Sequence, residues 1–453
     1  MHVTKMASIF FWECVPKIII RRSGAEPRRV FFQNYFLCLD YILTNHKMAG
    51  GLMQLVAYGA QDVYLSGNPQ ITMFKVVYRR HTNFAIESIE NTFNGQADFG
   101  KRVTATISRN GDLVTRVYLQ VDIPTVAKTG GAGFAWTRYL GHVLIKEVEV
   151  QIGGQRIDKH YGDWLTIWSE LTLPEEKRVG YFNMIGEVST LTTPAASVPG
   201  QTLYIPLQFW FNRNPGLALP LIALQYHEVK IEILFRPLGD LWTAADGLSP
   251  DATPQLGAAS LWIDYIYLDT DERRRFAQVS HEYLIEQLQF TGDESINNTN
   301  VKLRLNFNHP TKELVWVSQL DSHIDGATAP TTDGNQWANY TDALGYTGNN
   351  TMVDAKLQLN GHDRFATRAS AYFNLVQPYQ HHTRVPGNGI YVYSFGLKPE
   401  EHQPSGTVNF SRIDNATLLM TMASNADQKV RIYAVNYNVL RVMSGMAGVA
   451  YSN

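Results

Sequence analysis

Hydrophobic and polar residues alternate along most of this 453-residue chain with a period of two. Val103, Ala105 and Ile107 alternate with threonine and serine, and a second alternating run covers 117–123. Because successive side chains of a strand point to opposite faces, this pattern predicts strands that are buried on one side. Further strands are predicted at 203–211, 228–235, 260–268, 283–290, 301–307, 313–318, 354–359, 390–396, 416–422 and 429–442.

Two glycine-containing turns separate neighbouring strands of this pattern. Asn110-Gly111 lies between the first two alternating runs, and Gly153-Gly154 follows the alternating residues of 148–152. Such dipeptides favour a tight hairpin turn, because both central positions need a positive φ. Few segments show the 3.6-residue period of a helix, and the clearest are 162–171 and 270–279. The chain is therefore predicted to be mainly β.

The two halves of the chain resemble each other. The segment 150–156 (VQIGGQR) has a counterpart in 357–363 (LQLNGHD), and an aromatic-bearing helical stretch follows each. The segment 204–209 (YIPLQF) corresponds in the same way to 390–395 (IYVYSF). The offsets are 207 and 186 residues, which indicates duplication of a whole domain rather than a short solenoid repeat.

A short charged segment joins the halves. The strand predicted at 260–268 leads into Asp269, and Glu272 follows three residues later, which is the spacing of a helix capping box. The arginine run 273–275 is interpreted as the solvated face of a linker helix within 269–282, in preference to a nucleic-acid patch.

Composition and charge narrow the class of protein. The chain holds 39 basic and 41 acidic residues, and this balance argues against a nucleic-acid binder held by an overall positive field. Apolar residues make up 45%, enough for two or three packed domains, and no apolar run is long enough for a membrane span. Cys14 and Cys38 are the two cysteines, too few for a disulfide framework or a cysteine metal site.

Residues 1–47 differ from the rest of the chain in charge. They hold seven basic and three acidic residues, whereas the remaining 406 residues hold 32 and 38. A basic arm of this kind can bind membrane or nucleic acid. We favour the other interpretation, in which Met48 starts the native protein and 1–47 is an upstream extension.

One segment has the spacing of a phosphate-binding loop. Gly95, Gly100 and Lys101 match that motif, but Arg102 stands where a Ser or Thr would bind Mg²⁺. A strand is predicted to follow, so the loop lacks the helix N-terminus that would hold a phosphate. We therefore expect no nucleotide site. The chain also has no nucleophile elbow, and no enzyme activity is expected.

A cluster of metal-ligating residue types lies in a proline-rich stretch, at His381, His382, Glu400, Glu401 and His402. A β-barrel metal site usually needs alternate residues of one strand to point inward together, as in His-x-His, whereas adjacent histidines point to opposite faces. These histidines are therefore interpreted as surface side chains. We expect no catalytic residue, no metal and no cofactor.

Five Asn-x-Ser/Thr sequons occur, all in the second half, at Asn297, Asn339, Asn349, Asn409 and Asn415. Asn339 and Asn349 lie in the Gly-, Thr- and Asn-rich stretch 320–353, which is predicted to be a long surface loop. They are the better candidates for N-glycosylation, because the modification needs an exposed loop. Asn415 begins a predicted strand, so a structural role is expected there.

Several long motifs, from Met48 to the C-terminus, resemble a single family. They are MAGGLMQLVAYGAQDVYL (48–65), ISRNGDLVTRVYLQVDIP (107–124), GGQRIDKHYGDWL (153–165), LDTDERRRFAQVSHEYLIEQLQFTG (268–292), NFSRIDNATL (409–418) and RIYAVNYNVLRVMSGMAGVAYSN (431–453). The sequence closely resembles the major capsid proteins of nucleocytoplasmic large DNA viruses, most nearly those of algal phycodnaviruses. The resemblance covers 48–453 and does not extend to 1–47.

This resemblance implies an all-β fold of two consecutive eight-stranded antiparallel jelly rolls, with a short helical linker and few helices in loops. The implied segments are an extension 1–47, an arm 48–73, a first jelly roll 74–268, a linker 269–282 and a second jelly roll 283–453. The implied function is that of a structural subunit. Three copies would form a pseudo-hexagonal capsomer that tiles an icosahedral shell.

The resemblance also implies the partners of such a subunit. Neighbouring capsomers and minor capsid proteins are expected, together with the internal viral membrane, and no direct contact with nucleic acid. The protein is expected in the outer shell of the virion after assembly in the host cytoplasm, as a late protein that carries surface sugars.

The arm holds a short apolar stripe. Leu52, Leu55 and Val56 share one helical face, and Gly67 with the residues after it ends the helix. Two interpretations stay open, contact with minor capsid proteins or the membrane side, and packing on its own jelly roll. For the whole chain, the alternatives are a minor capsid paralogue and a jelly-roll module that binds glycans. A jelly-roll metalloenzyme is a third, disfavoured by the missing His-x-His pattern.

Overall fold

The computed structural model describes residues 50–129, 133–244, 249–324 and 334–451, so the extension 1–47 and the proposed start at Met48 lie outside the described residues. The chain divides into two compact units. The first ends at His81, and the second begins at Thr82. The described part of the first unit holds three short helices. They are α3 (Gly50–Val56), η1 (Ala60–Asp62) and α4 (Val63–Ser66). Gly67 ends α4, as the sequence predicts.

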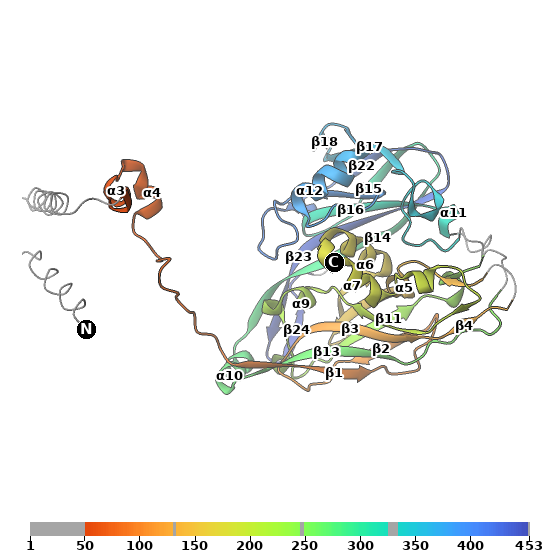
Figure 1. The fold of residues 1–453 in the computed structure, drawn as a ribbon, viewed down its shortest axis with the longest axis horizontal. Helices are drawn as coiled ribbons and strands as arrows, with labels where there is room; N and C mark the ends of the chain where they lie inside the picture. The colour runs from red at the N-terminus through yellow and green to blue at the C-terminus, as the bar shows by residue number, and fades with distance from the viewer. Residues whose placement is uncertain (1–49, 130–132, 245–248, 325–333, 452–453) are drawn as a thin grey trace, which may run out of the picture. The chain divides into compact units, whose positions relative to one another are not determined.

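The first half of the second unit is a sandwich of two antiparallel sheets (Figure 1). One sheet has the order β1 (Phe84–Thr92), β13 (Ala259–Leu268) and β3 (Leu113–Ile123), with β9 (Gln201–Pro206) and β10 (Leu219–Pro220) on β3. The other has the order β2 (Arg102–Thr106), β11 (Val229–Phe235), β6 (Ile145–Ile152) and β7 (Gln155–Tyr161). Two small ribbons pair β4 (Val126–Ala127) with β8 (Ser197–Val198), and β5 (Ala135–Trp136) with β12 (Trp242–Thr243).

The second half repeats this arrangement. One sheet has the order β14 (His281–Ile296), β23 (Gln428–Met443), β16 (Pro310–Leu320) and β20 (Ile390–Ser394), with β21 (Val408–Asn409) and β24 (Met446–Val449) at its sides. The other has the order β15 (Asn300–Leu305), β22 (Ala416–Met422), β17 (Met352–Leu359) and β18 (His362–Asp363), with β19 (Arg368–Ala369) on β17.

The two sandwiches share one strand order. Counting the eight main strands of each half along the chain, one sheet has the order first, eighth, third, sixth, and the other has second, seventh, fourth, fifth. This order is that of a jelly roll, so the predicted double jelly roll is confirmed. The duplication is confirmed too, because 150–156 and 357–363 both form the hairpin between strands four and five. The segments 204–209 and 390–395 both contribute strand six.

Few helices cover the sheets. In the first jelly roll they are α5 (Leu140–Leu144), α6 (Gly162–Thr172), α7 (Glu175–Ile185), α8 (Ser189–Thr192) and α9 (Trp210–Arg213), with turns η2 (Pro215–Leu217), η3 (Leu221–Ala223) and η4 (Leu238–Asp240). The linker helix is α10 (Thr270–Gln278). In the second they are α11 (Asp321–Ile324), the π-helix η6 (Tyr372–Val376) and α12 (Gln377–His381), with turns η5 (Leu344–Tyr346) and η7 (Phe410–Arg412).

The predicted helices at 162–171 and 270–279 are confirmed as α6 and α10. Asp269 caps α10 by accepting a hydrogen bond from the Thr270 amide at 2.8 Å. The strand predicted at 203–211 is too long, because α9 begins at Trp210. α7 was not predicted, since its one fully buried residue is Ile185 and such a helix shows no apolar stripe.

The predicted hairpin at Asn110-Gly111 is wrong. The flanking strands β2 and β3 lie in opposite sheets of the sandwich, and they pair with β11 and β13 instead of each other. Neither turn residue has a positive φ. Gly111 is needed for a different reason, because an added Cβ would lie 2.8 Å from Cβ of Tyr265. The second predicted hairpin is confirmed, since β6 pairs with β7 and Gly153 and Gly154 have φ of 58° and 83°.

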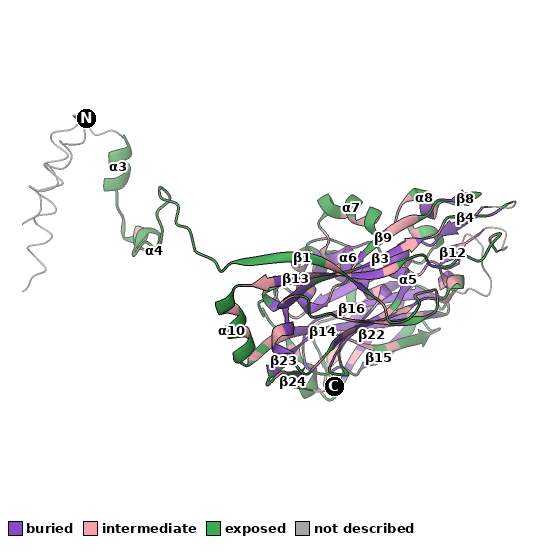
Figure 2. Cartoon of the chain, turned by 90° about the horizontal axis from the view of Figure 1, so that it is seen from below, coloured by how far each residue is buried: buried purple, intermediate pink, exposed green. Residues whose placement is uncertain are grey.

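Three large apolar clusters and a small fourth one fill the described part of the chain, and Figure 2 shows the buried residues concentrated between the sheets. The largest fills the first sandwich around Val117, Leu119 and Phe235 and extends to β14, β23 and β24 of the second roll. Another lies inside the second sandwich around Trp316 and Leu418. The third contains residues of both jelly rolls. The two rolls therefore share a core as well as a linker.

The close approach at Gly111 gives a stability prediction. Replacing Gly111 with alanine forces the 110–112 turn away from Tyr265, and overpacking of this kind costs about 1–3 kcal/mol. We expect the free energy of unfolding in urea to fall by that amount. Gly180→Ala in α7 is the matched control, because no atom lies within 4 Å of the added Cβ. Equal stability of the two variants would contradict the steric explanation.

Candidate assembly surfaces and the interface between the jelly rolls

Helix α6 of the first jelly roll packs on a sheet of the second. Its residues Trp164, Ile167, Trp168 and Leu171 are buried in one cluster with side chains from β16, β20 and β23. These partners are Val315, Val317, Ile390, Val392, Tyr433 and Val435. They alternate with residues that face the core of the second sandwich, so they form the outer face of its sheet. The helix follows directly from β7, which explains how the 162–172 segment reaches the neighbouring roll.

Hydrogen bonds surround this apolar contact. The Leu288 amide donates to Oδ1 of Asp158 at 3.1 Å, and the Arg384 amide donates to the Leu171 carbonyl at 3.0 Å. Nδ2 of Asn335 donates to the carbonyls of Gly239 and Trp242, at 2.8 and 2.9 Å. Backbone groups of both rolls are thus satisfied across the interface, which fixes the position of one roll against the other.

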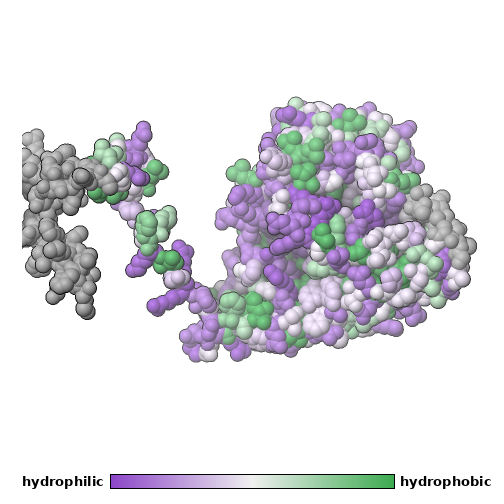
Figure 3. All heavy atoms as spheres, in the orientation of Figure 1, coloured by the Kyte–Doolittle hydropathy of each residue, from purple (hydrophilic) through white to green (hydrophobic). Residues whose placement is uncertain are grey.

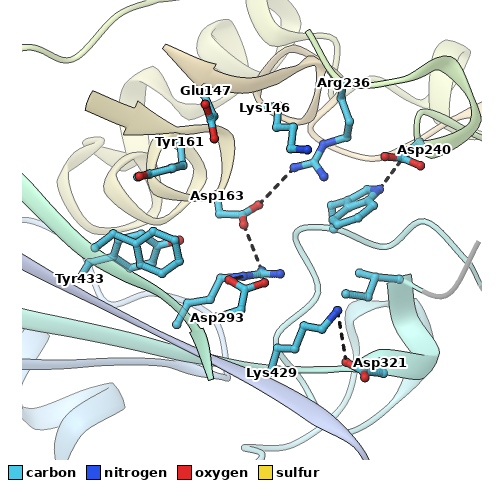
Figure 4. A pocket seen from close by; sticks show the side chains of 14 residues that line it. Lys146, Glu147, Tyr161, Asp163, Arg236, Asp240, Asp293, Asp321, Lys429 and Tyr433 are labelled. Carbon is cyan, nitrogen blue, oxygen red and sulfur yellow. Dashed lines mark hydrogen bonds and ion pairs between the residues drawn. The ribbon is translucent and has the colours of Figure 1, made fainter. Parts of the chain in front are cut away.

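A charged cleft of about 560 Å³ opens at one side of this interface (Figure 4). Asp163 at the start of α6 lies 3.0 Å from Arg431 of β23 and 4.0 Å from Arg236 of the first roll. Asp293 also pairs with Arg431 at 3.0 Å. The Arg236 guanidinium lies 3.9 Å from the ring centre of Trp337.

The pKa values in this cleft follow from burial and ion pairing. Burial disfavours the charged form of Arg431, but Asp163, Asp293 and the neighbouring tyrosines together outweigh it and raise the pKa of that guanidinium. Burial lowers the pKa of Arg236, although Asp163 opposes the shift. Since acids and bases of the cleft neutralise each other, the arrangement suits a structural contact between rolls rather than a site for a charged ligand.

A second buried ion cluster joins the rolls on the other side of α6. Glu286 of β14 lies 2.7 Å from Nζ of Lys312 and 3.0 Å from Arg213 of α9. Lys312 is buried, and its ammonium also donates to the Pro399 carbonyl. Burial raises the pKa of the Glu286 carboxyl, but Arg213 and Lys312 reverse the shift and lower it. Burying one carboxylate with two cations requires all three to stay in place.

The interpretation of His382 as a surface residue is wrong. Its side chain is fully buried, with Nε2 3.0 Å from Glu313 and Nδ1 2.9 Å from Glu400. Burial disfavours the imidazolium, but the Glu313 and Glu400 carboxylates outweigh it and raise the pKa of His382 to about 9. Pattern reasoning missed this because Glu313 belongs to a strand 69 residues away in sequence.

The remaining residues of that cluster do not converge. His381 is half-buried, with Nδ1 2.9 Å from the Leu397 carbonyl, His402 lies 4.0 Å from Glu286, and Glu401 pairs with Lys398. Among the described residues, no group of three or more metal-ligating side chains is arranged to hold an ion. At the rejected phosphate-loop motif, β2 begins at Arg102 as predicted, and Lys101 pairs with Asp98.

The sequons fall into two groups. Asn297, Asn349, Asn409 and Asn415 are exposed and stay candidates for glycosylation. Asn349 directly precedes Asn350, which forms an isolated β-bridge with Thr341. Asn415 directly precedes β22, in agreement with the strand predicted to begin there.

The prediction that Asn339 lies in an exposed surface loop is wrong. It is completely buried, and its amide nitrogen donates to Oε1 of Gln336 and to the Ala343 carbonyl at 2.7 and 2.9 Å. A sugar on that nitrogen has no room in the folded chain. The described part of 320–353 is thus partly core, because Asn339, Tyr340 and Thr341 all have low exposure.

Two family models match successive parts of the chain. The model described as "Major capsid protein N-terminus" matches residues 72–269, and "Large eukaryotic DNA virus major capsid protein" matches residues 272–448. The chain belongs to this family of viral major capsid proteins. The two matches meet at α10, between the two jelly rolls.

Individual relatives agree with the family models. The chain is 57% identical to the major capsid protein of Pyramimonas orientalis virus and 51% identical to that of Phaeocystis pouchetii virus. Each match covers 90% of this chain and all of the relative. A chain from the quasi-atomic model of the Paramecium bursaria Chlorella virus 1 capsid is 42% identical with a TM-score of 0.71. That match covers 84% of this chain and 100% of the other.

These comparisons confirm the resemblance to phycodnavirus capsid proteins. The chain is a structural component of a viral capsid, and its relatives are capsid proteins rather than enzymes. The functional surfaces are therefore those that hold the two rolls together and those that meet other chains. Sequence reasoning identified the family, but it did not find the α6 interface or the buried ion clusters.

The His382 contacts predict a pH-dependent stability. Because its pKa rises from 6.5 to about 9 on folding, the stabilising contribution is fully present below pH 6.5 and is lost as pH rises through 9. At low pH it amounts to about 3–4 kcal/mol, because the pKa rises by about 2.5 and each pKa unit corresponds to roughly 1.4 kcal/mol. We expect the difference in unfolding free energy between the natural chain and His382→Gln to shrink from about pH 6 to about pH 10.

His381→Gln is the control, because His381 is half-buried and lies within hydrogen-bond distance of a backbone carbonyl instead of a carboxylate. Urea unfolding at several pH values measures both variants. A His382→Gln difference that is the same at every pH would show that the imidazole contributes by packing and not by its charge.

Proposed function

We propose that this chain is the principal subunit of an icosahedral viral shell and that three copies form a pseudo-hexagonal capsomer. The observation that carries the proposal is the repeated strand order of two jelly rolls joined through α6. Three rigid pairs of similar rolls supply six similar corners, so a trimer can occupy a six-sided lattice position. Obligate interfaces of this kind commonly bury about 2,000–5,000 Å².

The proposal extends to partners and location. Neighbouring capsomers and minor capsid proteins are the proposed contacts, with the internal viral membrane beneath the shell and assembly in the host cytoplasm. The described residues contain no helix that is long and apolar enough to cross a bilayer. The predicted division into arm 48–73, rolls 74–268 and 283–453, and linker 269–282 stays part of this proposal; the main strands begin at Phe84 and His281.

Solution mass tests the trimer. We expect protein expressed from Met48 and the full 453-residue chain to elute without ligand at three times the subunit mass, measured by light scattering after gel filtration. A full chain that trimerises while the shorter one stays monomeric would assign assembly to residues 1–47. Monomers from both chains at high concentration would contradict the capsomer proposal and favour a jelly-roll binding module.

The arm is the proposed contact to the proteins or membrane beneath the shell. In the described part of its own unit, Leu55, Tyr64 and Leu65 are 80%, 89% and 89% exposed. Apolar side chains exposed on consecutive helices are typical of a segment that binds a partner. We expect deletion of 52–66 to leave trimers intact but to prevent shell assembly, measured by electron microscopy of particles from infected or co-expressing cells. Normal shells from the deleted chain would contradict this contact.

A further inference from the structure

The outer sheet face of the second jelly roll is covered by the chain itself. Val315 of β16 lies opposite Val392 of β20 and opposite Tyr433 of β23, and all three are buried under α6. Two residues further along β16, on the same face, Val317 lies opposite Ile390, and α6 covers this pair too. This face is therefore a docking surface for the helix between strands five and six of the other roll.

The first jelly roll has an equivalent face. Tyr118 of β3 lies opposite Pro206 of β9 and opposite Trp262 of β13, which are the positions of Val315, Val392 and Tyr433 in the matching strands. Gln120 lies opposite Tyr204, which therefore takes the place of Ile390. Because the two rolls have the same strand order, residues at matching positions of paired strands correspond to each other. The duplication seen in the sequence gives the same alignment, with 204 matched to 390.

The aromatic side chains of this equivalent face are partly open to solvent. The rings of Tyr118 and Trp262 are stacked with centres 6.4 Å apart, and Tyr204 lies 6.2 Å from Tyr118. Tyr204 is 39% exposed, and Phe84 and Ile86 of the edge strand β1 are more exposed still. Figure 2 shows β1 exposed along most of its length. Within the described part of the chain, the buried indole nitrogen of Trp262 has no hydrogen-bond partner.

The second jelly roll has an equivalent of α6. Helices η6 and α12 lie between its fifth and sixth main strands, as α6 does in the first roll. Phe373 anchors this segment, with its ring 5.2 Å from that of Trp316 in the core. Leu375, Val376 and Tyr379 point outward with exposures of 49%, 40% and 80%. Figure 3 shows an apolar patch over this part of the second roll.

The charges of the two surfaces are complementary. Glu90 of β1 and Asp122 of β3 lie on the outer face of the first roll, where Glu90 is the cross-strand neighbour of Trp262. Arg364 and Arg368 precede η6 in the second roll, and both are exposed. Opposite charges at the edge of an apolar contact favour one orientation of the partner.

We propose that the outer face of β1, β13, β3 and β9 binds the η6–α12 segment of a second copy of this chain. In this contact a helical segment of one chain covers the outer sheet face of another chain, as α6 covers the outer sheet face of the second roll within one chain. Because each copy offers one of each surface, the contact is head-to-tail and closes into a ring when the rotation is one third of a turn. The inference rests on the proposed trimer and names the surfaces that form it.

The test uses the full chain with Cys14 and Cys38 replaced by serine, so that added cysteines are the sole thiols. Tyr204→Lys places a charge in the apolar contact, and we expect its mass by light scattering to fall to one third. Tyr204→Phe keeps the ring and is expected to stay trimeric. Tyr226→Lys is the matched control, since Tyr226 is 75% exposed in a loop of the same roll. Circular dichroism and thermal unfolding confirm that each variant is folded.

A cross-link locates the contact directly. In the Tyr204→Cys, Leu375→Cys double variant, a flexible bismaleimide should link separate chains into dimers and trimers on a denaturing gel. Neither single variant should give these bands. A natural chain that is monomeric would contradict the trimer and the inference together. A trimeric natural chain with a trimeric Tyr204→Lys variant, or with no cross-link between 204 and 375, would overturn the inference and leave the trimer standing.

Discussion

The packing of α6 on the second jelly roll is the contact on which the rest of the molecule depends. Trp164 and Trp168 carry large apolar surfaces out of one sandwich and bury them against Tyr433 and its neighbours in the other. Burial of a large side chain contributes about 1.5–3 kcal/mol, so this cluster is a major source of cohesion between the rolls. A linker of one nine-residue helix, α10, could not hold two sandwiches in a fixed orientation without it.

The buried charges on either side of α6 give that contact its specificity. Apolar surfaces alone would tolerate sliding of one sheet past a helix, whereas an ion pair loses its partner when either side moves. Asp163 with Arg431 on one side, and Glu286 with Arg213 on the other, therefore allow one register of the two rolls. A capsid protein needs this rigidity, because an error in the angle between rolls would be repeated in every copy of the lattice.

Much of the fold could be predicted from local patterns. Strand alternation depends on neighbours two residues apart, and the Gly153-Gly154 hairpin depends on two consecutive φ angles, so both are visible in sequence. Asn110-Gly111 shows the limit of this reasoning. The same local signal connects strands of different sheets there, because the partner of each strand is chosen by residues more than 100 positions away.

The sequence by itself determined the strand pattern, the duplication, the linker helix and the family, since each is carried by residues close together in the chain. The tertiary structure decided which strands share a sheet, which histidine of the adjacent pair 381–382 is buried and which sequon is closed. His382 looked like a loop residue until Glu313 and Glu400 were brought to its two nitrogens. Asn339 looked like a loop residue, but the fold buries it completely, and the Gln319 side chain of β16 donates to its backbone carbonyl. Both depend on burial, and burial is set by parts of the fold that short stretches of sequence do not contain.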